Sequence, residues 1–504
     1  MPDEFDILPT PSSIEESDQE LGYAMRHNPL SRTVYSYVKT GEIIIGLGRG
    51  GSGSLTIFIK KEGDERITVR KILSEAMMTA KWTRQGEGPM LPPFVKARCQ
   101  AEYLNALPRS VRCYFPTASD VIEREIPIPV DLREDGRTTH REVIYEMEYV
   151  PGEDVSQFIE KHSPPTAVVA RLYAEILSVL NRVVHTVDRV PAPGETLDIS
   201  YFKKIEDRLA VCRRTAPSTF NEHLLGTGRI LINGVPYLNW STLLARFRKD
   251  PEFLRILEPP FHSLVMGDAN TENIKITNVA PLILAQRLID SHASAEDVDR
   301  ALASITSESL GIRFLDPRAV GFRSVGREAR DDPMYDNKPW HNSIGHYDEI
   351  HHEYFTLRIR FDVRHTPCVD IEYIDGNPYQ RSYLVREESV DCGNIDTAAP
   401  QGMADYFAPI MTALYGLDDP DSLHVRDDPY WLIRFAFTMG THFTAMPPYH
   451  LQAETDVPFT DNYQIQRRPV AIYCEGIKWL NWALQMLEGE RKEFLGLRVP
   501  SPSA

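Results

Sequence analysis

An aspartate and an asparagine stand five residues apart between two apolar runs, in the segment LVMGDANTENIKI at 264–276. Gly, Asp, Asn and Thr favour turns and Val and Ile favour strands, so the segment predicts a loop between two strands. The carboxylate of Asp268 could orient a hydroxyl group and accept its proton, and the amide oxygen of Asn273 suits Mg2+. A later apolar run, IRFLDPRAVG, supplies a further oxygen ligand in Asp316. Together the three residues predict a phosphoryl-transfer site, with a plain turn as the alternative.

A glycine cluster, GLGRGGSGS, precedes these residues and holds two overlapping GxGxxG matches. A dinucleotide site would need a helix directly after the cluster, whereas SLTIFIKK predicts a strand. A glycine loop between antiparallel strands instead covers nucleotide phosphates, because small residues let backbone N–H groups approach the oxygens. A flexible turn is the alternative. The residues expected to contact phosphate are Gly46, Gly48, Gly50, Gly51, Ser52 and Gly53.

A lysine in the third predicted strand, ITVRKIL, could neutralise phosphate charge. Successive residues of a strand face opposite sides, so only one of Arg70 and Lys71 can face the glycine loop. Lys71 is preferred because it stands at the end of a strand similar to VAIK, and Arg70 is the alternative. Such a lysine needs an anionic partner. Glu102, on a helix predicted at 93–107, is the candidate, and a surface helix charge is the alternative.

The elements that must position these residues indicate an α+β fold. A β-rich region with antiparallel strands is followed by mostly helical sequence, which predicts a small N-terminal lobe and a larger helical lobe. The predicted divisions are a disordered acidic tail at 1–32, an N-terminal lobe at 33–148, a helical lobe at 149–504, an insertion at about 278–310 and a β-hairpin at about 355–390.

Individual elements follow from periodicity and from turn residues. Strands are predicted at 111–118, 141–150, 356–363, 368–374 and 381–388, the last two joined by the turn DGNP. Helices are predicted at 164–187, 294–305, 428–445 and 467–494.

Composition indicates which partners to expect. The chain has 504 residues, 42% of them hydrophobic, and a net charge of -17, which argues against general binding to nucleic acid. No apolar run reaches the length of about 18 residues that a membrane span needs. The acidic N-terminus does not resemble a secretory signal, and the six scattered cysteines indicate reduced thiols. We therefore expect a cytoplasmic protein that binds neither membranes nor nucleic acids. The sequence does not indicate its oligomeric state.

The segment MGDANTENI resembles the HGDxxxxN signature of the aminoglycoside phosphotransferase and choline kinase branch of the protein-kinase-like fold. The resemblance implies that Asp268 is the catalytic aspartate, that Asn273 binds metal, and that Asp316, in LDPR, is the second metal-binding aspartate. Met266 stands where the family has a histidine that braces the loop. The segment at 332–350 resembles a helix of bacterial phosphotransferases encoded with capsule or other polysaccharide genes.

The segment YEMEYVPGEDV resembles the hinge between the lobes of that family, where the backbone of Glu148, Tyr149 and Val150 would meet adenine. The implied activity is an ATP- and Mg2+-dependent transfer of phosphate to a hydroxyl of a small molecule, such as a sugar, an aminoglycoside or an amino alcohol. Two alternatives remain open. One is a pseudokinase-like scaffold that binds nucleotide, and the other is a protein-directed kinase or nucleotidyl transferase.

Four histidines lie in HNSIGHYDEIHHEYF: His341, His346, His351 and His352. Their spacing fits neither HExxH nor a zinc finger, and we interpret the segment as a polar helix with some core histidines.

Overall fold

The computed structural model describes residues 37–48, 55–74, 93–119, 121–127, 138–317, 330–362, 366–385, 390, 393, 395–451 and 466–502. These residues form two compact units. Unit 1 contains the described residues up to Pro151 together with 315–317, and unit 2 contains the rest. The boundary after Pro151 lies close to the predicted hinge, but Leu315 and Asp316 belong to unit 1. The predicted tail at 1–32 lies outside the described residues.

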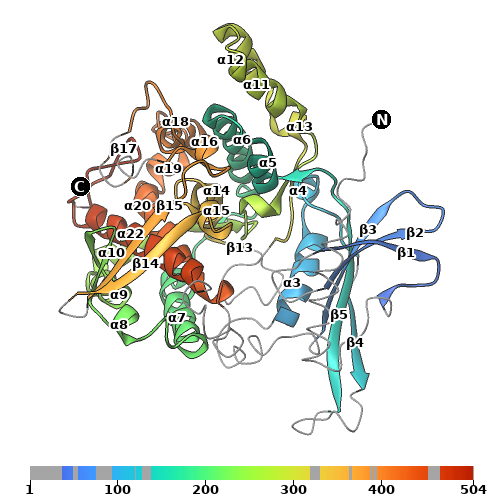
Figure 1. Ribbon diagram of the computed structural model, residues 1–504, viewed down its shortest axis with the longest axis horizontal. Coiled ribbons are helices and arrows are strands. Elements are labelled where there is room, and N and C mark those ends of the chain that lie inside the picture. Colours follow the sequence, from blue (N-terminus) through green and yellow to red (C-terminus); the bar gives the residue numbers. More distant parts are fainter. Residues whose placement is uncertain are drawn as a thin grey trace. The chain divides into compact units, whose positions relative to one another are not determined.

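Unit 1 is built on an antiparallel sheet with the strand order β1-β2-β3-β5-β4. Figure 1 shows its longest helix, α3, beside β3 and β5. The elements are β1 (Glu42–Gly48), β2 (Leu55–Lys61), β3 (Ile67–Ser74), α3 (Pro93–Ala106), α4 (Arg109–Arg112), β4 (Ile122–Pro127) and β5 (Thr139–Glu148). The three predicted N-terminal strands and the helix predicted at 93–107 are confirmed.

Alternation along β3 places Arg70 and Lys71 on opposite faces of this sheet. Arg70 is almost fully buried and forms ion pairs with Glu42 at 2.7 Å and with Glu146 at 2.5 Å. Lys71 lies opposite Tyr145 of β5, on the face that α3 covers. Arg70 therefore links β3 to β1 and β5 through its ion pairs. Lys71, and not Arg70, points toward α3.

The strand predicted at 111–118 is wrong. Val111 and Phe115 are both fully buried and lie four residues apart, a helical spacing, and the chain there forms α4 and a turn. The fifth strand of the sheet is instead β4, whose sequence IEREIP is largely charged. Such an exposed edge strand carries little of the apolar signal by which buried strands are found.

Unit 2 is mostly helical. Its helices are α5 (Val155–His162), α6 (Thr166–Val179), α7 (Lys203–Thr215), α8 (Glu222–Leu225), α9 (Trp240–Lys249), α10 (Pro251–Leu257), α11 (Ala280–Asp290), α12 (Ala295–Ser304), α13 (Ser307–Leu310), α14 (Lys338–Asn342), α15 (Tyr347–His351), α16 (Gln380–Tyr383), α18 (Met403–Tyr415), α19 (Leu423–Arg426), α20 (Trp431–Thr444) and α22 (Arg467–Leu487). Shorter turns of π or 3-10 geometry are η4 (Leu180–Val184), η5 (Leu197–Phe202), η6 (Thr271–Asn273), η8 (Pro333–Asp336) and η9 (Pro447–Tyr449). The predicted helices are confirmed as α6, α12, α20 and α22.

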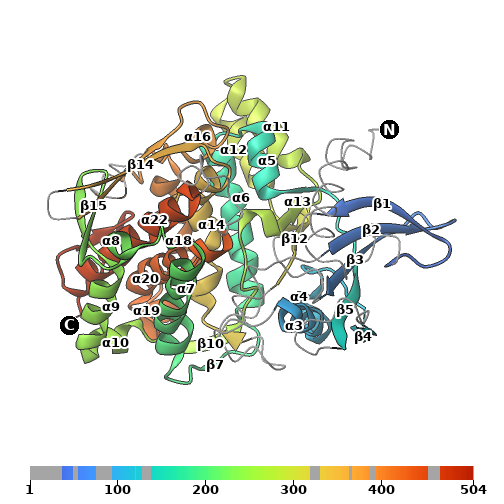
Figure 2. The same ribbon diagram turned by 60° about the horizontal axis from the view of Figure 1, so that its bottom comes forward.

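The apolar helices α20 and α22 pack against each other in the core of unit 2 (Figure 2). Glycines allow their close approach: a Cβ atom on Gly476 would lie 2.3 Å from Thr444 Oγ1 and 2.5 Å from Thr444 N. On the other helix, a Cβ atom on Gly440 would lie 2.7 Å from Leu480 N. The two closely packed helices also contact elements described below, α20 with η8 and α22 with α15.

Small sheets complete unit 2, in the strand orders β13-β10-β7, β12-β11-β6 and β14-β15-β8-β9, with the pair β16-β17. Their bounds are β6 (Glu153–Asp154), β7 (Val190–Pro191), β8 (Arg229–Ile232), β9 (Val235–Leu238), β10 (Phe261–Leu264), β11 (Ile274–Ile276), β12 (Ile312–Phe314), β13 (Arg330–Asp331), β14 (Phe355–Phe361), β15 (Pro367–Tyr373), β16 (Glu493–Phe494) and β17 (Leu497–Arg498).

The predicted hairpin at 355–390 is formed by β14 and β15. The third strand, predicted at 381–388, is wrong over its described part, 381–385, where the chain ends the helix α16. Asn377 is the third residue of the DGNP turn, and its Oδ1 accepts hydrogen bonds from the backbone N–H groups of Tyr379 and Gln380. Tyr379, the residue just before α16, and Tyr383, the last residue of α16, stack one helical turn apart. The hydrogen bonds to the Asn377 side chain and the aromatic pair favour a helical turn over a strand.

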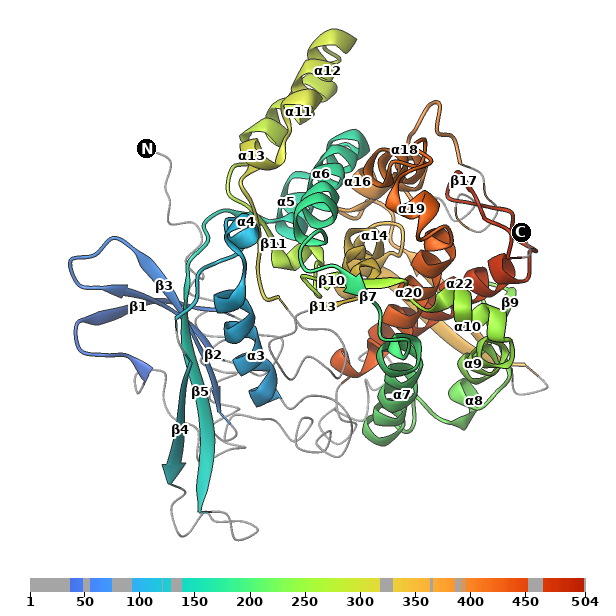
Figure 3. The ribbon, with the colours of Figure 1, turned by 180° about the vertical axis from the view of Figure 1, so that it is seen from behind.

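The predicted insertion lies between β11 and β12 and consists of α11, α12 and α13. Ser294 caps α12 by accepting a hydrogen bond from Asp297 N, as a Ser before an acidic first turn predicts. Figure 3 shows α12 at the outer end of the insertion, while α11 contacts α6. Within the described chain, no helix has both the length and the apolarity needed to cross a bilayer.

Candidate active site

The opening motif forms the predicted strand, loop and strand, from β10 through η6 to β11. Asn270 caps η6, because its Oδ1 accepts from the N–H groups of Glu272 and Asn273, each at 3.1 Å. Asn273 Nδ2 in turn donates to the backbone oxygen of Asp268 at 3.0 Å. These short-range bonds explain the five-residue spacing, since the amide closes the loop on the carbonyl of the aspartate.

Asp268 is only 5% exposed and contacts a lysine that the sequence analysis missed. Lys338 Nζ, from α14, lies 2.6 Å from Asp268 Oδ1 and 3.2 Å from the backbone oxygen of Gly267. A lysine that is 3% exposed needs such a partner, because an unpaired buried ammonium group is costly. The only sequence signal was a lysine within the aromatic segment MYDNKPW.

Asp336 of η8 braces the start of the candidate catalytic loop, residues 266–273. It is 1% exposed, and its two carboxylate oxygens accept from Met266 N at 2.7 Å and from Gly267 N at 2.6 Å. His185 Nε2 lies 2.9 Å from the same carboxylate. Met266 Sδ accepts from Asp268 N at 3.1 Å. The start of the loop is thus held through its backbone N–H groups, and position 266 contributes a sulfur acceptor.

A second carboxylate, Asp348 of α15, holds η6. It accepts from Thr271 Oγ1 at 3.1 Å, from Asn342 Nδ2 at 2.5 Å and from the hydroxyl of Tyr383. Burial raises the pKa of Asp348 to about 7, and the hydrogen bonds from Tyr383 and Asn342 oppose that rise. The segments before and after the loop are therefore both anchored to the region at 332–350.

A buried polar cluster lies next to Lys338. The Tyr335 hydroxyl contacts Lys204 Nζ and lies 3.0 Å from His442 Nδ1, and Lys338 Nζ sits 5.0 Å from the centre of the Tyr335 ring. Burial holds the pKa of Lys204 well below its usual value, and nearby cations lower it further. This cluster offers several hydrogen-bonding groups near the carboxylate of Asp268.

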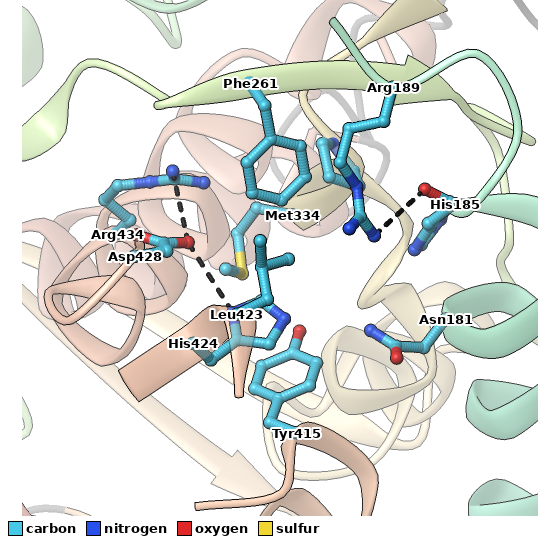
Figure 4. Close-up of a pocket in the computed structure, with 11 residues that line it drawn as sticks. Asn181, His185, Arg189, Phe261, Met334, Tyr415, Leu423, His424, Asp428 and Arg434 are labelled. Carbon is cyan, nitrogen blue, oxygen red and sulfur yellow. Dashed lines mark hydrogen bonds and ion pairs between the residues drawn. The ribbon is translucent and has the colours of Figure 1, made fainter. Parts of the chain in front are cut away.

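A small pocket lies beside the brace, and Figure 4 shows the side chains that line it. His185, the histidine of the brace, is part of its wall. Arg189 lies over the ring of Phe261 at 4.9 Å, and the buried Arg434 is paired with Asp332 at 2.9 Å. His185 therefore lines the pocket and also contacts Asp336, the carboxylate that binds the loop.

In unit 1, Lys71 contacts the carboxylate that was predicted to bind metal. Lys71 Nζ lies 2.6 Å from Asp316 Oδ1, and Gln100 Nε2 donates to the same oxygen at 2.7 Å. Gln100 Oε1 also lies 3.3 Å from Lys71 Nζ and contacts the Tyr145 hydroxyl. Lys71, Gln100, Tyr145 and Asp316 therefore form one polar cluster between α3 and the sheet.

Glu102 as the partner of Lys71 is corrected by this geometry. Glu102 is exposed, whereas Gln100 is 8% exposed and makes the contact. Residues two apart on a helix point roughly 200° apart, so the face of α3 that presents Gln100 cannot also present Glu102. The expected partner of Lys71 was an acidic side chain of the helix, whereas its partners in the structure are the neutral amide of Gln100 and the carboxylate of Asp316.

Asp316 has a left-handed backbone, with φ of 54°. That conformation costs a non-glycine residue about 1 to 3 kcal/mol, and such residues concentrate at functional sites. Leu315 alone separates it from the end of β12 at Phe314, so Asp316 lies just beyond the end of a strand.

The remaining predicted nucleotide contacts lie in or near unit 1 strands. Gly46 follows an irregularity in the pairing of β1 with β2, and Gly48 ends β1. Three further candidates stand at the end of β5 or just after it: Glu148 Oε2 accepts from Thr117 N at 3.1 Å, the Tyr149 ring packs edge-on against Phe58, and Val150 is buried. Gly50, Gly51, Ser52 and Gly53 lie outside the described residues.

Two of the four histidines are core residues, as predicted. His341 stacks on Phe443 with ring centres 4.6 Å apart, and His346 Nδ1 lies 2.5 Å from Glu349 Oε2. The predicted polar helix at 341–355 is wrong as a single element, since the segment holds the end of α14, then α15, and reaches the start of β14. His351 and His352 differ from the other two, since both face Glu272 of the catalytic loop.

Comparison with known proteins adds little to this geometry. No protein family model matches the chain, and no curated protein sequence matches it. Among solved structures, that of the microcompartment-associated aminopropanol kinase is similar over 96% of this chain and 100% of its own, with 12% identity and a TM-score of 0.36. The function is therefore argued from the residues themselves.

Proposed function

We propose that this protein is an ATP-dependent phosphotransferase with a two-lobed protein-kinase-like fold, which transfers the γ-phosphate to a hydroxyl of a small molecule. One observation carries the proposal: the braced loop holds Asp268 against Lys338 while Asn273 is hydrogen-bonded to the Asp268 carbonyl. A carboxylate fixed in this way can orient a hydroxyl and accept its proton, which contributes about 10^2- to 10^4-fold in rate.

The cluster in unit 1 supports the nucleotide side of the proposal. Lys71 would neutralise phosphate charge, and Gln100 would keep it in place. Asp316 in unit 1 and Asn273 in unit 2 offer carboxylate and amide oxygens, which fit the preference of Mg2+ for oxygen ligands. When bound, Mg2+ would supply positive charge to the phosphates. The left-handed backbone at Asp316 is a second reason to assign that residue a role.

The proposed acceptor is a small alcohol such as a sugar, an aminoglycoside or an amino alcohol. It would place its hydroxyl at Asp268, near the polar cluster of Tyr335, Lys204 and His442. We also propose that the protein acts in the cytoplasm and binds neither nucleic acid nor membranes.

The test is the variant Asp268→Asn, incubated with ATP labelled at the γ-phosphate and a panel of these alcohols. ATP binding should persist while transfer falls by about 10^2-fold or more. Asp405→Asn is the matched control: Asp405 is also a buried aspartate that accepts three backbone hydrogen bonds, at the start of α18. An unchanged transfer rate in Asp268→Asn would remove Asp268 from this role.

Other labelling patterns would point to the alternatives. Transfer of label from the α-phosphate would indicate a nucleotidyl transferase. Label on a protein and on no alcohol would indicate a protein kinase. Binding of ATP without any product would favour a pseudokinase-like scaffold.

A further inference from the structure

Two adjacent histidines and a glutamate of the catalytic loop converge in unit 2. Glu272 Oε1 lies 3.1 Å from His351 Nε2 and 3.8 Å from His352 Nε2. One ligand atom from each of the three residues lies within 4.8 Å of each of the others. The residues come from segments about 80 positions apart in the chain, η6 and the end of α15, so the tertiary structure alone brings them together.

We propose that Glu272, His351 and His352 bind a divalent transition-metal ion of the zinc class. Zinc bonds to imidazole nitrogen and carboxylate oxygen are about 2.0 to 2.2 Å long, so the ligand atoms of a tetrahedral site lie roughly 3.4 Å apart. The two contacts of Glu272, at 3.1 and 3.8 Å, bracket that separation. Two imidazoles and one carboxylate are a known zinc ligand set, with water completing the shell.

The surroundings hold the imidazoles in place and leave the site open to solvent. His351 stacks on Tyr347, with ring centres 5.4 Å apart, and the rings of His351 and His352 are nearly perpendicular, at 88°. Ser156 Oγ lies 3.4 Å from His352 Nε2, the nitrogen that would bind the ion, so this long contact would give way to the metal. The side chains of both histidines are 26% exposed and that of Glu272 is 40% exposed, so an ion and its waters could enter.

The proposed ion is chemically distinct from the Mg2+ assigned to phosphoryl transfer. Mg2+ prefers an all-oxygen shell, whereas imidazole ligands favour zinc, copper, nickel or iron. Glu272 directly precedes Asn273, and Thr271 is already bonded to Asp348 of α15. A bound ion would add a second link between the catalytic loop and α15. A simple ion pair between Glu272 and protonated histidines is the alternative.

The experiment uses the full chain, freed of metal by a chelator, with Co2+ as a spectroscopic probe and Zn2+ as its competitor. We expect visible d–d bands of a low-coordinate Co2+ centre, one ion per chain, removed by equimolar Zn2+. The variants His351→Asn, His352→Asn and Glu272→Gln should each weaken binding by about tenfold or more. His292→Asn changes an exposed histidine outside the cluster and should bind as the wild type does.

One further variant and one further condition separate this site from the proposed Mg2+ site. Asp316→Asn, and an excess of Mg2+, should leave the Co2+ bands unchanged, because neither concerns the imidazole ligands. Absent bands, or bands that persist in both histidine variants, would overturn the proposal in favour of the ion pair. The readout does not depend on phosphoryl transfer, so the metal site and the proposed function can fail separately.

Discussion

The contact of Asp336 with the candidate catalytic loop leads to a prediction in which an effect on the transfer rate can be told apart from an effect on the stability of the fold. Asp336 is 1% exposed and accepts backbone hydrogen bonds from Met266 at 2.7 Å and from Gly267 at 2.6 Å. The variant Asp336→Asn keeps the shape of the side chain but replaces one accepting oxygen with an N–H donor. One of the two loop amides then faces a donor, and the other bonds to a neutral oxygen.

The magnitude follows from the types of bond that are lost. A hydrogen bond to a charged group contributes about 1.5 to 3 kcal/mol, and a neutral one about 1 kcal/mol. Losing one charged bond and weakening the other should therefore destabilise the protein by about 2 to 4 kcal/mol. The loop that carries Asp268 would also shift, and a displacement of about 1 Å at a reacting group can cost about 10^2-fold in rate.

The assay compares Asp336→Asn with Asp405→Asn, measuring thermal unfolding by calorimetry and the rate of phosphoryl transfer from labelled ATP. Asp405 accepts from the backbone N–H groups of Asp396, Gln401 and Gly402, all at 3.0 to 3.1 Å. Both variants should unfold at lower temperature. Only Asp336→Asn should also lower the kcat, by tenfold or more, with the KM for ATP changed little.

Two results would refute this reasoning. If Asp336→Asn loses stability but transfers phosphate at the wild-type rate, Asp336 does not position Asp268. If Asp336→Asn unfolds at the wild-type temperature, the carboxylate does not bind the loop amides in solution.

The remaining predictions concern stability. Gly476→Ala should lower the melting temperature, because the added methyl group would lie 2.5 Å from Thr444 N. Overpacking costs about 1 to 3 kcal/mol, which exceeds the gain of about 1 kcal/mol in helix propensity. A higher melting temperature would contradict the packing described for α20 and α22. Burial, with the neighbouring carboxylates Asp332 and Asp336, raises the pKa of Asp331 to about 8. The folded state then holds a proton that the unfolded state releases near pH 4, so the contribution of Asp331 to stability should fall as the pH rises from about 4 to about 8. Melting temperatures of the wild type and Asp331→Asn, recorded across that range, should diverge, and parallel curves would show that Asp331 titrates normally.

Local patterns determined much of the fold. The alternation of ITVRKIL is enough to separate Arg70 from Lys71, because neighbouring residues of any strand face opposite sides. The turn residues of LVMGDANTENIKI fixed the loop between β10 and β11, and Ser294 marked the start of α12. These features depend on residues a few positions apart, whose chemistry a sequence displays directly.

Predictions failed where a partner distant in the chain decided the outcome. The apolar residues at 111–118 fit a strand as well as a helical turn. The core takes up Val111 and Phe115 from the helical form, in which residues four positions apart lie on one side of the chain. On α3, the helix phase relative to the sheet brought Gln100 rather than Glu102 to Lys71. A sequence shows which residues share a face of one helix, but not which face meets the neighbouring strands.

The side chains around Asp268 were decided only by the tertiary structure. Lys338 and Asp336 lie about 70 positions from the loop that they support, and no local spacing connects them to it. The same holds for His351 and His352, which the sequence presents as two polar residues of a helix and the fold brings to Glu272. The sequence by itself therefore determined the loop and its candidate chemical groups. The tertiary structure determined which charges neutralise and brace them, because burial requires a partner for each charge without specifying where in the chain that partner lies.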